Sequence, residues 1–266
     1  MAARKAGLVG TVTGVDMDPA HLDIALSLGM VDRATTELSE VARADLVVLA
    51  VPVTVIVSLL PEVARYVKNG CLVTDVGSVK SPILQEGDAA FPDGRFVAGH
   101  PIAGQERSGP TAARSDLFEG ANWIVTPSSL TARHAVESVS ALWQGVGSAI
   151  LSMEAEWHDE IFAAVSHLPH LVAYALMDAV LGMPQGDERL KFAAGGLRDY
   201  TRVAASHPVM WRDIFLMNRE PTLRVLAAYR EALTALEVAI REGDGEALIA
   251  RLTRARAARE EMTHRP

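Results

Sequence analysis

Short apolar runs alternate with helical patterns through the first half of the chain. Several runs have the length and polar boundaries of buried strands: residues 11–15, 45–50, 71–74, 96–98, 123–126 and 149–152. Helical patterns follow three of them and begin at Asp18, Val53 and Thr131. This alternation of strand and helix predicts a mostly parallel sheet with helices packed on its faces.

No strand pattern continues beyond Glu154. From there apolar residues recur at helical spacing, and Gly243 and Gly245 mark a break between two helices in the C-terminal tail. A chain of 266 residues is long enough for two domains with separate cores. We therefore expect an α/β domain at residues 1–153, followed by an all-α domain at residues 154–266.

The composition argues against several classes of partner. A net charge of −8 without a cluster of Lys and Arg disfavours binding to nucleic acid or to an anionic membrane. The single cysteine, Cys71, excludes an intrachain disulfide and fits a reducing compartment. The N-terminus lacks an apolar stretch of signal-peptide length, so we expect a cytoplasmic protein. No metal site is expected.

One segment, residues 161–183, is apolar enough to suggest a membrane span. Polar side chains and a proline interrupt it, at His167, Pro169, His170 and Asp178. We therefore interpret this segment as a helix buried in protein, for example at a subunit interface, and expect no membrane partner.

Two polar motifs each come directly after an apolar run. They are Asp75-Val-Gly-Ser-Val-Lys80 and Gly99-His-Pro-Ile-Ala-Gly-Gln-Glu-Arg-Ser-Gly109. Because ligands bind at the carboxyl ends of strands in open α/β sheets, we expect Ser78 and His100 in one crevice. A hydroxyl beside an imidazole indicates proton transfer. Lys80 is expected to start a helix and to face water.

An acidic residue ends the first predicted strand. In dinucleotide-binding folds an acid at the end of the second strand accepts hydrogen bonds from the adenosine ribose. Asp16 fits this position if the first predicted strand here corresponds to the second strand of the fold. Since Met17 rather than Arg stands beside it, NAD is favoured over NADP. The alternative is a solvated turn, in which Asp16 and Asp18 only precede and cap the next helix.

The opening of the chain lacks the other signature of such a fold. A dinucleotide-binding domain begins with a strand and a G-x-G-x-x-G turn that holds the pyrophosphate. Residues 1–10 are instead typical of a last helical turn and a loop, with Gly7 and Gly10 as C-cap and turn residues. We expect that the sequence is truncated at its start and lacks the central strand and the Gly-rich turn.

Several motifs along the chain resemble those of one enzyme family. They are Gly77-Ser-Val-Lys80, Gly99-His-Pro-Ile-Ala-Gly-x-Glu-x-Ser-Gly109, Asp116-Leu-Phe118, Ser166-His-Leu-Pro-His170, Gly195-Gly-Leu-Arg-Asp-Tyr-Thr-Arg202 and Met210-Trp-Arg-Asp-Ile-Phe215. Their order and spacing resemble the prephenate and arogenate dehydrogenases of tyrosine biosynthesis over nearly the whole chain. The resemblance implies a Rossmann-like domain without its first strand, then a helical domain that binds substrate and forms a homodimer.

The reaction that the resemblance implies is NAD-dependent oxidative decarboxylation of prephenate to 4-hydroxyphenylpyruvate. Two alternatives stay open: an arogenate dehydrogenase that produces tyrosine, and a catalytically impaired dimeric remnant. A third, a β-hydroxyacid dehydrogenase of similar plan, would use a catalytic Lys in the helical domain. The helical domain offers Lys191, which lies outside any convincing motif.

The resemblance also implies roles for individual residues. His100 would accept the proton of the C4 hydroxyl, and Ser78 would bond the other ring nitrogen or the substrate. Arg202 would grip a substrate carboxylate. Ser166 and His170 would assist from one helical face, provided that Pro169 kinks the helix or lies near its start. The remaining residues expected to bind substrate are Gln105 and Trp211, and the expected cofactor-binding residues are Asp16, Val51, Pro52 and Ser78.

Overall fold

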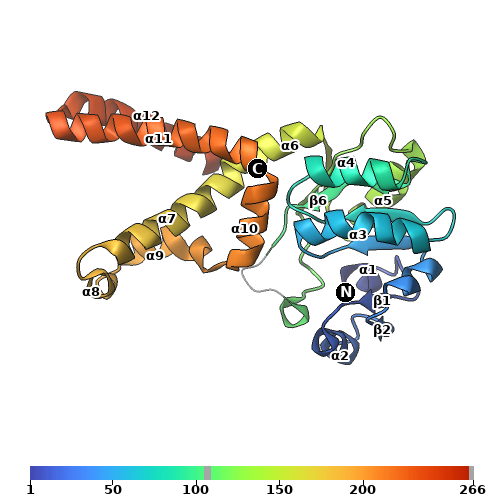
Figure 1. The fold of residues 1–266 in the computed structure, drawn as a ribbon. Helices are drawn as coiled ribbons and strands as arrows, with labels where there is room; N and C mark the ends of the chain where they lie inside the picture. The colour runs from blue at the N-terminus through green and yellow to red at the C-terminus, as the bar shows by residue number, and fades with distance from the viewer. Residues whose placement is uncertain (105–108, 264–266) are drawn as a thin grey trace. The chain divides into compact units, whose positions relative to one another are not determined.

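The computed structural model describes residues 1–104 and 109–263. The chain divides into two compact units, Met1–Arg219 and Glu220–Pro266. The first unit holds all the described strands and the helices that immediately follow them, and the second holds nearly all of α11 and α12 (Figure 1). The predicted class, an α/β half followed by helices, is confirmed.

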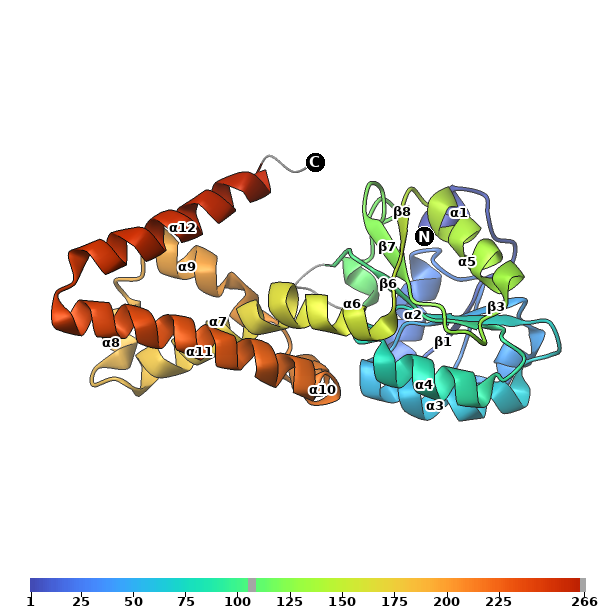
Figure 2. The ribbon, with the colours of Figure 1, turned by 90° about the horizontal axis from the view of Figure 1, so that it is seen from above.

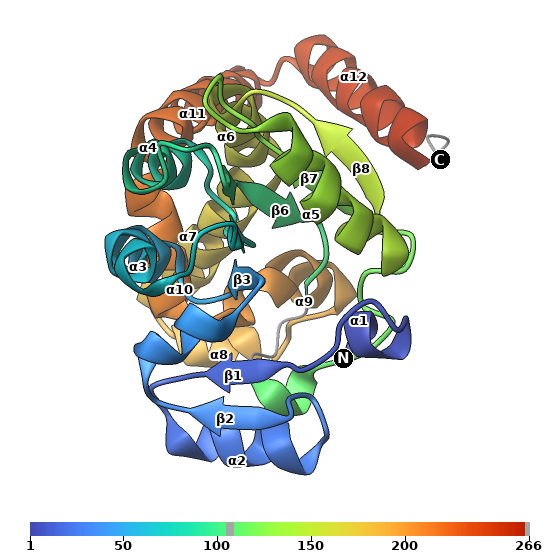
Figure 3. The ribbon, with the colours of Figure 1, turned by 90° about the vertical axis from the view of Figure 1, so that its right-hand side faces the viewer.

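Three hydrogen-bonded sets of strands make up the β-structure. They are β1 (Thr13–Val15) with β2 (Arg33–Thr35); β3 (Leu46–Leu49), β4 (Leu72–Asp75) and β5 (Phe96–Val97); and β6 (Gly99–Pro101), β7 (Asn122–Val125) and β8 (Ala149–Ser152). All pairings are parallel except that of β6 with β7. Figure 3 shows β1 and β2 side by side, with α2 packed against them.

The helices of the α/β half are α1 (Ala2–Lys5), α2 (Pro19–Ser27), α3 (Val53–Tyr66), α4 (Ser81–Ala90) and α5 (Arg133–Gly145). After β8 come α6 (Ala155–Phe162), α7 (Leu168–Gly182), α8 (Gly186–Leu190), α9 (Gly195–Thr201), α10 (Pro208–Met217), α11 (Arg219–Glu242) and α12 (Gly245–Thr263). Short 3-10 turns span Leu38–Arg43, Pro110–Ala112 and Arg202–Ala205, and a π-helical turn spans Ala163–His167.

Helices cover both faces of the sheet that carries β3 to β5. Helices α3 and α4 pack on one face and α5 on the other, as Figure 2 shows. The α3 side buries aliphatic residues such as Ile56, Leu60 and Val63 completely, whereas the α5 side stacks the rings of Trp123 and Trp143 at 5.4 Å. Two apolar clusters therefore fix the position of the strand ends between them.

The structure confirms two local features predicted near the N-terminus. The side chain of Asp18 caps α2 by accepting a hydrogen bond from the N–H of Ala20 at 2.9 Å. Gly7, which follows the C-cap residue of α1, has a φ of +68°, a conformation that glycine adopts without strain. At the other end of the chain, α11 and α12 are separated at Gly243, as the sequence predicts.

The apolar segment predicted to be a buried helix is helical but largely uncovered within this chain. Residues 155–182 form a continuous helical stretch that is long and apolar enough to cross a membrane, by length and composition alone. Ala173 is buried in α7, but Val165 is 65% exposed and Leu181 49% exposed. Few of its apolar side chains are buried in the described part of the chain, so burial at a subunit interface stays a prediction.

Candidate active site

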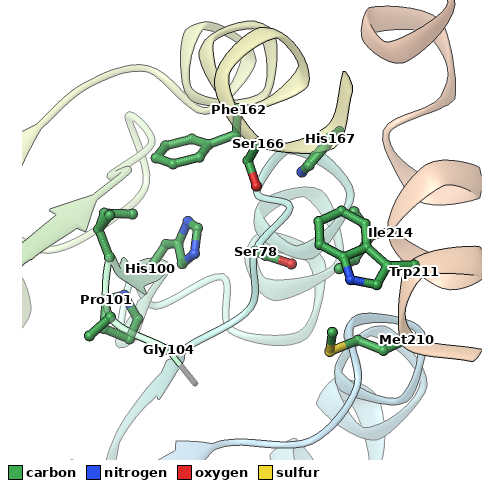
Figure 4. A pocket seen from close by; sticks show the side chains of 12 residues that line it. Ser78, His100, Pro101, Gly104, Phe162, Ser166, His167, Met210, Trp211 and Ile214 are labelled. Atoms are coloured by element: carbon green, nitrogen blue, oxygen red, sulfur yellow. The ribbon is translucent and has the colours of Figure 1, made fainter. Parts of the chain in front are cut away.

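A pocket of about 360 Å³ lies within the first unit. Its walls come from the loop after β4, strand β6, helix α6 with the π-helical turn, and helix α10. The polar and aromatic residues that line it are Ser78, His100, Phe162, Ser166, His167 and Trp211. Figure 4 shows His100 on one side of the pocket and Trp211 on the other, with Ser166 and His167 at its upper rim.

His100 lies at the end of a buried hydrogen-bonded chain. Its Nδ1 is 2.9 Å from Nε2 of His158, and Nδ1 of His158 is 2.8 Å from Oδ1 of Asp159. The Asp159 carboxylate also accepts the backbone N–H groups of Lys80 and Ser81, both at 2.8 Å. Asp159 thus joins the start of α4 to the two imidazoles.

The direction of these hydrogen bonds fixes the tautomer of His100. Burial alone would raise the pKa of Asp159, but hydrogen bonds from His158 and Ser81 outweigh burial and lower it, so the group is a carboxylate that only accepts. His158 must then donate from Nδ1 and accept at Nε2. His100 must donate from Nδ1, which leaves the lone pair on its Nε2.

Both imidazoles are held in the neutral form. Burial lowers the pKa of His100 well below its ordinary value of 6.5, and the neighbouring His158 and Lys80 lower it further. Burial also lowers the pKa of His158, against the opposing effect of Asp159. A neutral His100 with a free lone pair is the protonation state that a general base requires at neutral pH.

The residue before His100 is held by a buried ion pair. Lys80 pairs with Asp75, and both side chains have no exposed area. The Lys80 ammonium also donates to the carbonyl of Gly99 at 2.7 Å, and Asp75 accepts the N–H of Gly99 at 3.1 Å. The prediction that Lys80 faces water is wrong, because its charge is satisfied inside the protein by groups from β4 and β6.

His167 has a second, separate set of partners. Its Nδ1 lies 3.0 Å from Nδ2 of Asn218, and the same Nδ2 donates to the backbone carbonyl of Asp159 at 2.8 Å. Burial lowers the pKa of His167 to about 4. His167 is therefore neutral near pH 7, like His100.

A π-helical turn at Ala163–His167 accommodates Pro169 within the helical stretch. A proline lacks the N–H that an α-helix needs, and α7 begins immediately before it at Leu168. Ser166 and His167 line the pocket, and His170 stacks on the ring of Trp211 at 3.7 Å. Pro169 thus lies in the first turn of α7, which is the condition set for it, and the His170 ring reaches back to the carbonyl of Ser166 at 2.9 Å.

Comparisons with known proteins agree on one family. Residues 1–152 match the family description "Prephenate dehydrogenase, nucleotide-binding domain", and residues 154–254 match "Prephenate dehydrogenase, dimerization domain". The chain belongs to the prephenate dehydrogenase family. The resemblance that the motifs indicated is confirmed.

Individual relatives in this family are similar over most of the chain. A prephenate dehydrogenase of Bacillus subtilis is 36% identical over 89% of this chain and 65% of its own length. A cyclohexadienyl dehydrogenase of Zymomonas mobilis is 35% identical over 94% of this chain and 86% of its own length. The crystal structure of prephenate dehydrogenase from A. aeolicus in complex with hydroxyphenyl propionate and NAD+ has a TM-score of 0.92 and 35% identity, with 98% of this chain and 92% of that chain covered.

Within this family frame, the structure brings together some of the predicted site residues. Ser78, His100, Ser166 and Trp211 line the same pocket. On His100, however, the Nδ1 partner is His158 rather than Ser78. The hydrogen bond expected from the serine to that nitrogen is thus replaced by an imidazole from α6.

Other predicted substrate-binding residues lie elsewhere. Arg202 is exposed at the start of the 3-10 turn Arg202–Ala205 and does not line the pocket. His170 contacts the pocket through Trp211, and its Nδ1 donates to the carbonyl of Ser166 at 2.9 Å. Gln105 lies outside the described residues.

The predicted cofactor-binding residues all lie at the carboxyl ends of strands. Asp16 follows β1, Val51 and Pro52 follow β3, and Ser78 follows β4. The side chain of Asp16 is 46% exposed, although Oδ1 accepts the N–H of Asp18 at 2.9 Å. These positions suit the ribose and nicotinamide ends of a dinucleotide.

No turn among the described residues matches the Gly-rich turn that holds the pyrophosphate of a dinucleotide. Gly7 and Gly10 at the start of the chain have nothing within 4 Å of an added Cβ, so packing within the described residues does not require a glycine at either position. No described strand is hydrogen-bonded to both β1 and β3, which belong to separate hydrogen-bonded sets. The fit to a dinucleotide is therefore partial: both ends have candidate residues, but the pyrophosphate does not.

Sequence reasoning missed His158, Asp159, His167 and Asn218. The adjacent His158 and Asp159 occur on a helical pattern, but nothing local links them to a histidine 58 positions earlier. For His167 the sequence indicates only an interruption of an apolar segment. Buried polar residues are usually hydrogen-bonded, so polar residues within a helical pattern are weak candidates for paired groups. This signal could have pointed to all four residues.

Proposed function

We propose that this chain catalyses the NAD-dependent oxidative decarboxylation of prephenate to 4-hydroxyphenylpyruvate. The observation that carries the proposal is the neutral His100, with its free Nε2 lone pair, in the wall of a pocket of suitable size. Family membership supplies the reaction class. When bound, NAD supplies the acceptor for the hydride that leaves ring carbon C4.

His100 accepts the proton of the substrate's C4 hydroxyl at Nε2. The Nδ1–H bond to His158 keeps the ring oriented, and the negative charge of Asp159 stabilises the imidazolium that forms. The ring of Phe162 lies 5.0 Å from the His100 ring and 4.5 Å from the His158 ring, which limits the access of water to their hydrogen bond. Ser78 is placed to bond the substrate or the cofactor rather than the His100 Nδ1.

The substrate's carboxylates need donors. Arg202 remains the proposed cationic anchor, and the hydroxyl of Ser166 faces the pocket directly. The indole N–H of Trp211 is buried and lacks a hydrogen-bond partner among the described residues, so a substrate oxygen would satisfy it. His170 acts indirectly, because it stacks on Trp211 and holds that ring in place.

The cofactor's ends are assigned to strand termini. Asp16 would hold the adenosine ribose, and Val51, Pro52 and Ser78 would border the nicotinamide. The exposed side chain of Met17 leaves a ribose 2′-phosphate without a counter-charge at that position, which favours NAD over NADP.

A homodimer explains the uncovered apolar helix. The second half of the chain matches a dimerization domain, and the stretch from α6 through the π-helical turn to α7 exposes Trp157, Val165 and Leu181. A second copy would bury these side chains in a cytoplasmic protein. Light scattering after gel filtration should give a dimer mass, and Leu181→Glu should shift it toward the monomer; a monomeric parent protein would contradict the dimer.

The decisive experiment measures NADH formation with prephenate and with arogenate as substrates. We expect turnover with prephenate, and a clear preference for arogenate would replace the first substrate by the second. Thermal stabilisation by NAD, measured on the same preparation, separates failure to bind the cofactor from failure of the chemistry. Stabilisation by NAD without NADH from either substrate would refute the proposed reaction.

A further inference from the structure

The side-chain amide of Asn218 determines which nitrogen of His167 carries the proton. A backbone carbonyl only accepts hydrogen bonds, so the Asn218 atom that lies 2.8 Å from the Asp159 oxygen must be the NH2 group. Its second hydrogen points to Nδ1 of His167, 3.0 Å away. Nδ1 of His167 therefore accepts, and the proton of the neutral ring sits on Nε2.

Asp159 determines the tautomers of both His100 and His167, and the two tautomers are opposite. Its carboxylate acts through His158 to leave a lone pair on Nε2 of His100, and its carbonyl acts through Asn218 to leave a hydrogen on Nε2 of His167. Both imidazoles line the pocket, and Figure 4 shows them approaching it from different sides. The pocket thus presents a neutral acceptor and a neutral donor at separate places.

The Nε2–H of His167 faces a part of the pocket wall in which the structure describes no cationic side chain. Among the pocket-lining residues that the structure describes, none is Lys or Arg. Ser166 and His167 are the polar groups on that side, and Ser166 can rotate its hydroxyl whereas the His167 hydrogen is fixed by packing and by Asn218. His167 is 1% exposed as a residue, and a fixed N–H donor on such a buried ring is suited to an anionic oxygen of a bound ligand.

We propose that His167 is a substrate-binding residue that donates its Nε2–H to a carboxylate oxygen, and that Asn218 is its positioning residue. This inference rests on the proposed function, because prephenate carries carboxylates at the end of the ring opposite the C4 hydroxyl that His100 accepts. Together the two histidines distinguish a hydroxyl at one end of the substrate from an anion at the other.

Kinetics with paired variants test the role of His167. Loss of a hydrogen bond to a charged group should raise the KM for prephenate about tenfold or more in His167→Phe. His167→Gln, which can place an amide N–H near the Nε2 position, should recover much of this loss. His134→Gln, an exposed histidine on α5, is the control and should match the parent protein. NAD affinity should be the same in all four proteins.

Product inhibition then identifies the carboxylate. 4-Hydroxyphenylpyruvate keeps the side-chain carboxylate and lacks the ring carboxylate. If the inhibition constant of this product is larger in His167→Phe than in the parent protein, His167 binds the side-chain carboxylate. If it is unchanged, His167 binds the ring carboxylate. Either assignment also requires that the KM for prephenate is raised. A folded His167→Phe protein with the parent KM would overturn the inference.

A spectroscopic measurement on the unmodified protein is independent of turnover and of variant folding. Nitrogen-15 NMR of labelled histidines should show His167 protonated at Nε2 and His100 protonated at Nδ1 near pH 7. Protonation of His167 at Nδ1 would overturn the assignment even if the enzyme is active. The expected tautomers in a protein that does not turn over would preserve the inference about the pocket and refute only the proposed reaction.

Discussion

The ammonium of Lys80 lies 2.7 Å from the carbonyl oxygen of Gly99, the residue directly before His100. Asp75, the partner of Lys80, accepts the N–H of the same glycine at 3.1 Å. One buried ion pair therefore satisfies both polar backbone groups of Gly99. It ties the end of β4 to the start of β6, and so fixes the backbone from which the proposed base projects.

Replacing Lys80 by Met should destabilise the fold strongly. The change leaves Asp75 as an unpaired buried charge, and we expect the free energy of unfolding to fall by about 3–5 kcal/mol. Urea denaturation measures the loss. Lys68→Met is the matched control, because Lys68 pairs with Asp45 at 2.7 Å on the surface and should change stability by less than about 1 kcal/mol. Equal effects of the two substitutions would contradict the structural role of the buried pair.

Gly99→Ala should disturb the site through packing alone. A Cβ at this position would lie 2.3 Å from the Trp123 ring, so the strand or the ring must move. We expect a loss of about 1–3 kcal/mol in the free energy of unfolding, with reduced turnover because His100 moves with the backbone. Gly10→Ala, where nothing lies within 4 Å, should leave stability and turnover near the parent values.

His100→Asn should separate chemistry from cofactor binding. The asparagine amide can still donate to His158 but offers no basic nitrogen, so kcat should fall by about 100- to 10,000-fold. The Kd for NAD should stay unchanged. A variant that keeps most of its kcat would show that His100 is not the base.

Arg202→Gln should mainly raise the KM for prephenate, with kcat little changed, if the exposed guanidinium anchors a substrate carboxylate. Steady-state kinetics at saturating NAD measures both constants. Because Arg202 does not line the described pocket, this variant is a sharp test: an unchanged KM would remove Arg202 from the proposed site.

Buried neutral histidines should make the protein less stable in acid. The pKa of His167 is about 4 in the folded chain against an ordinary value of 6.5. As the pH falls from 6.5 toward 4, the unfolded chain binds a proton at this residue and the folded chain does not. The free energy of unfolding should therefore fall over this window, on the order of 3 kcal/mol for His167 alone.

Urea denaturation at a series of pH values checks this dependence, with His167→Gln as the comparison. The folded-state pKa values of His100 and His158 are also lowered, and both residues remain in the variant. The difference between the two curves thus reports His167. Parallel curves between pH 6.5 and 4 would show that His167 is not held neutral.

Local patterns predicted much of the fold, because the forces that they reflect are local. The apolar run at 45–50 became β3, and Asp18 caps α2 as expected. The strand β2 is not predicted by such patterns, because Arg33–Thr35 contains no apolar run. Strand signals depend on burial, and this short strand is only partly buried.

Only those site residues that lie within recognisable sequence motifs could be predicted. Ser78 and His100 could be placed at strand ends from their neighbours in sequence. The environment of Lys80 could not, because the groups that satisfy its charge include the Gly99 carbonyl, 19 positions later. The same holds for Asp159 and Asn218, which meet 59 positions apart. Long-range pairing of buried polar groups leaves almost no local trace.

The π-helical turn at 163–167 makes this stretch intolerant of insertions and deletions. Each residue in an α-helix rotates the following side chains by about 100°. Removing one residue here would turn α7 about its axis and take His170 off the Trp211 ring, with almost no loss of helix content. The exposed Ala164 can be exchanged for another residue, but the number of residues between Phe162 and His170 is fixed by geometry.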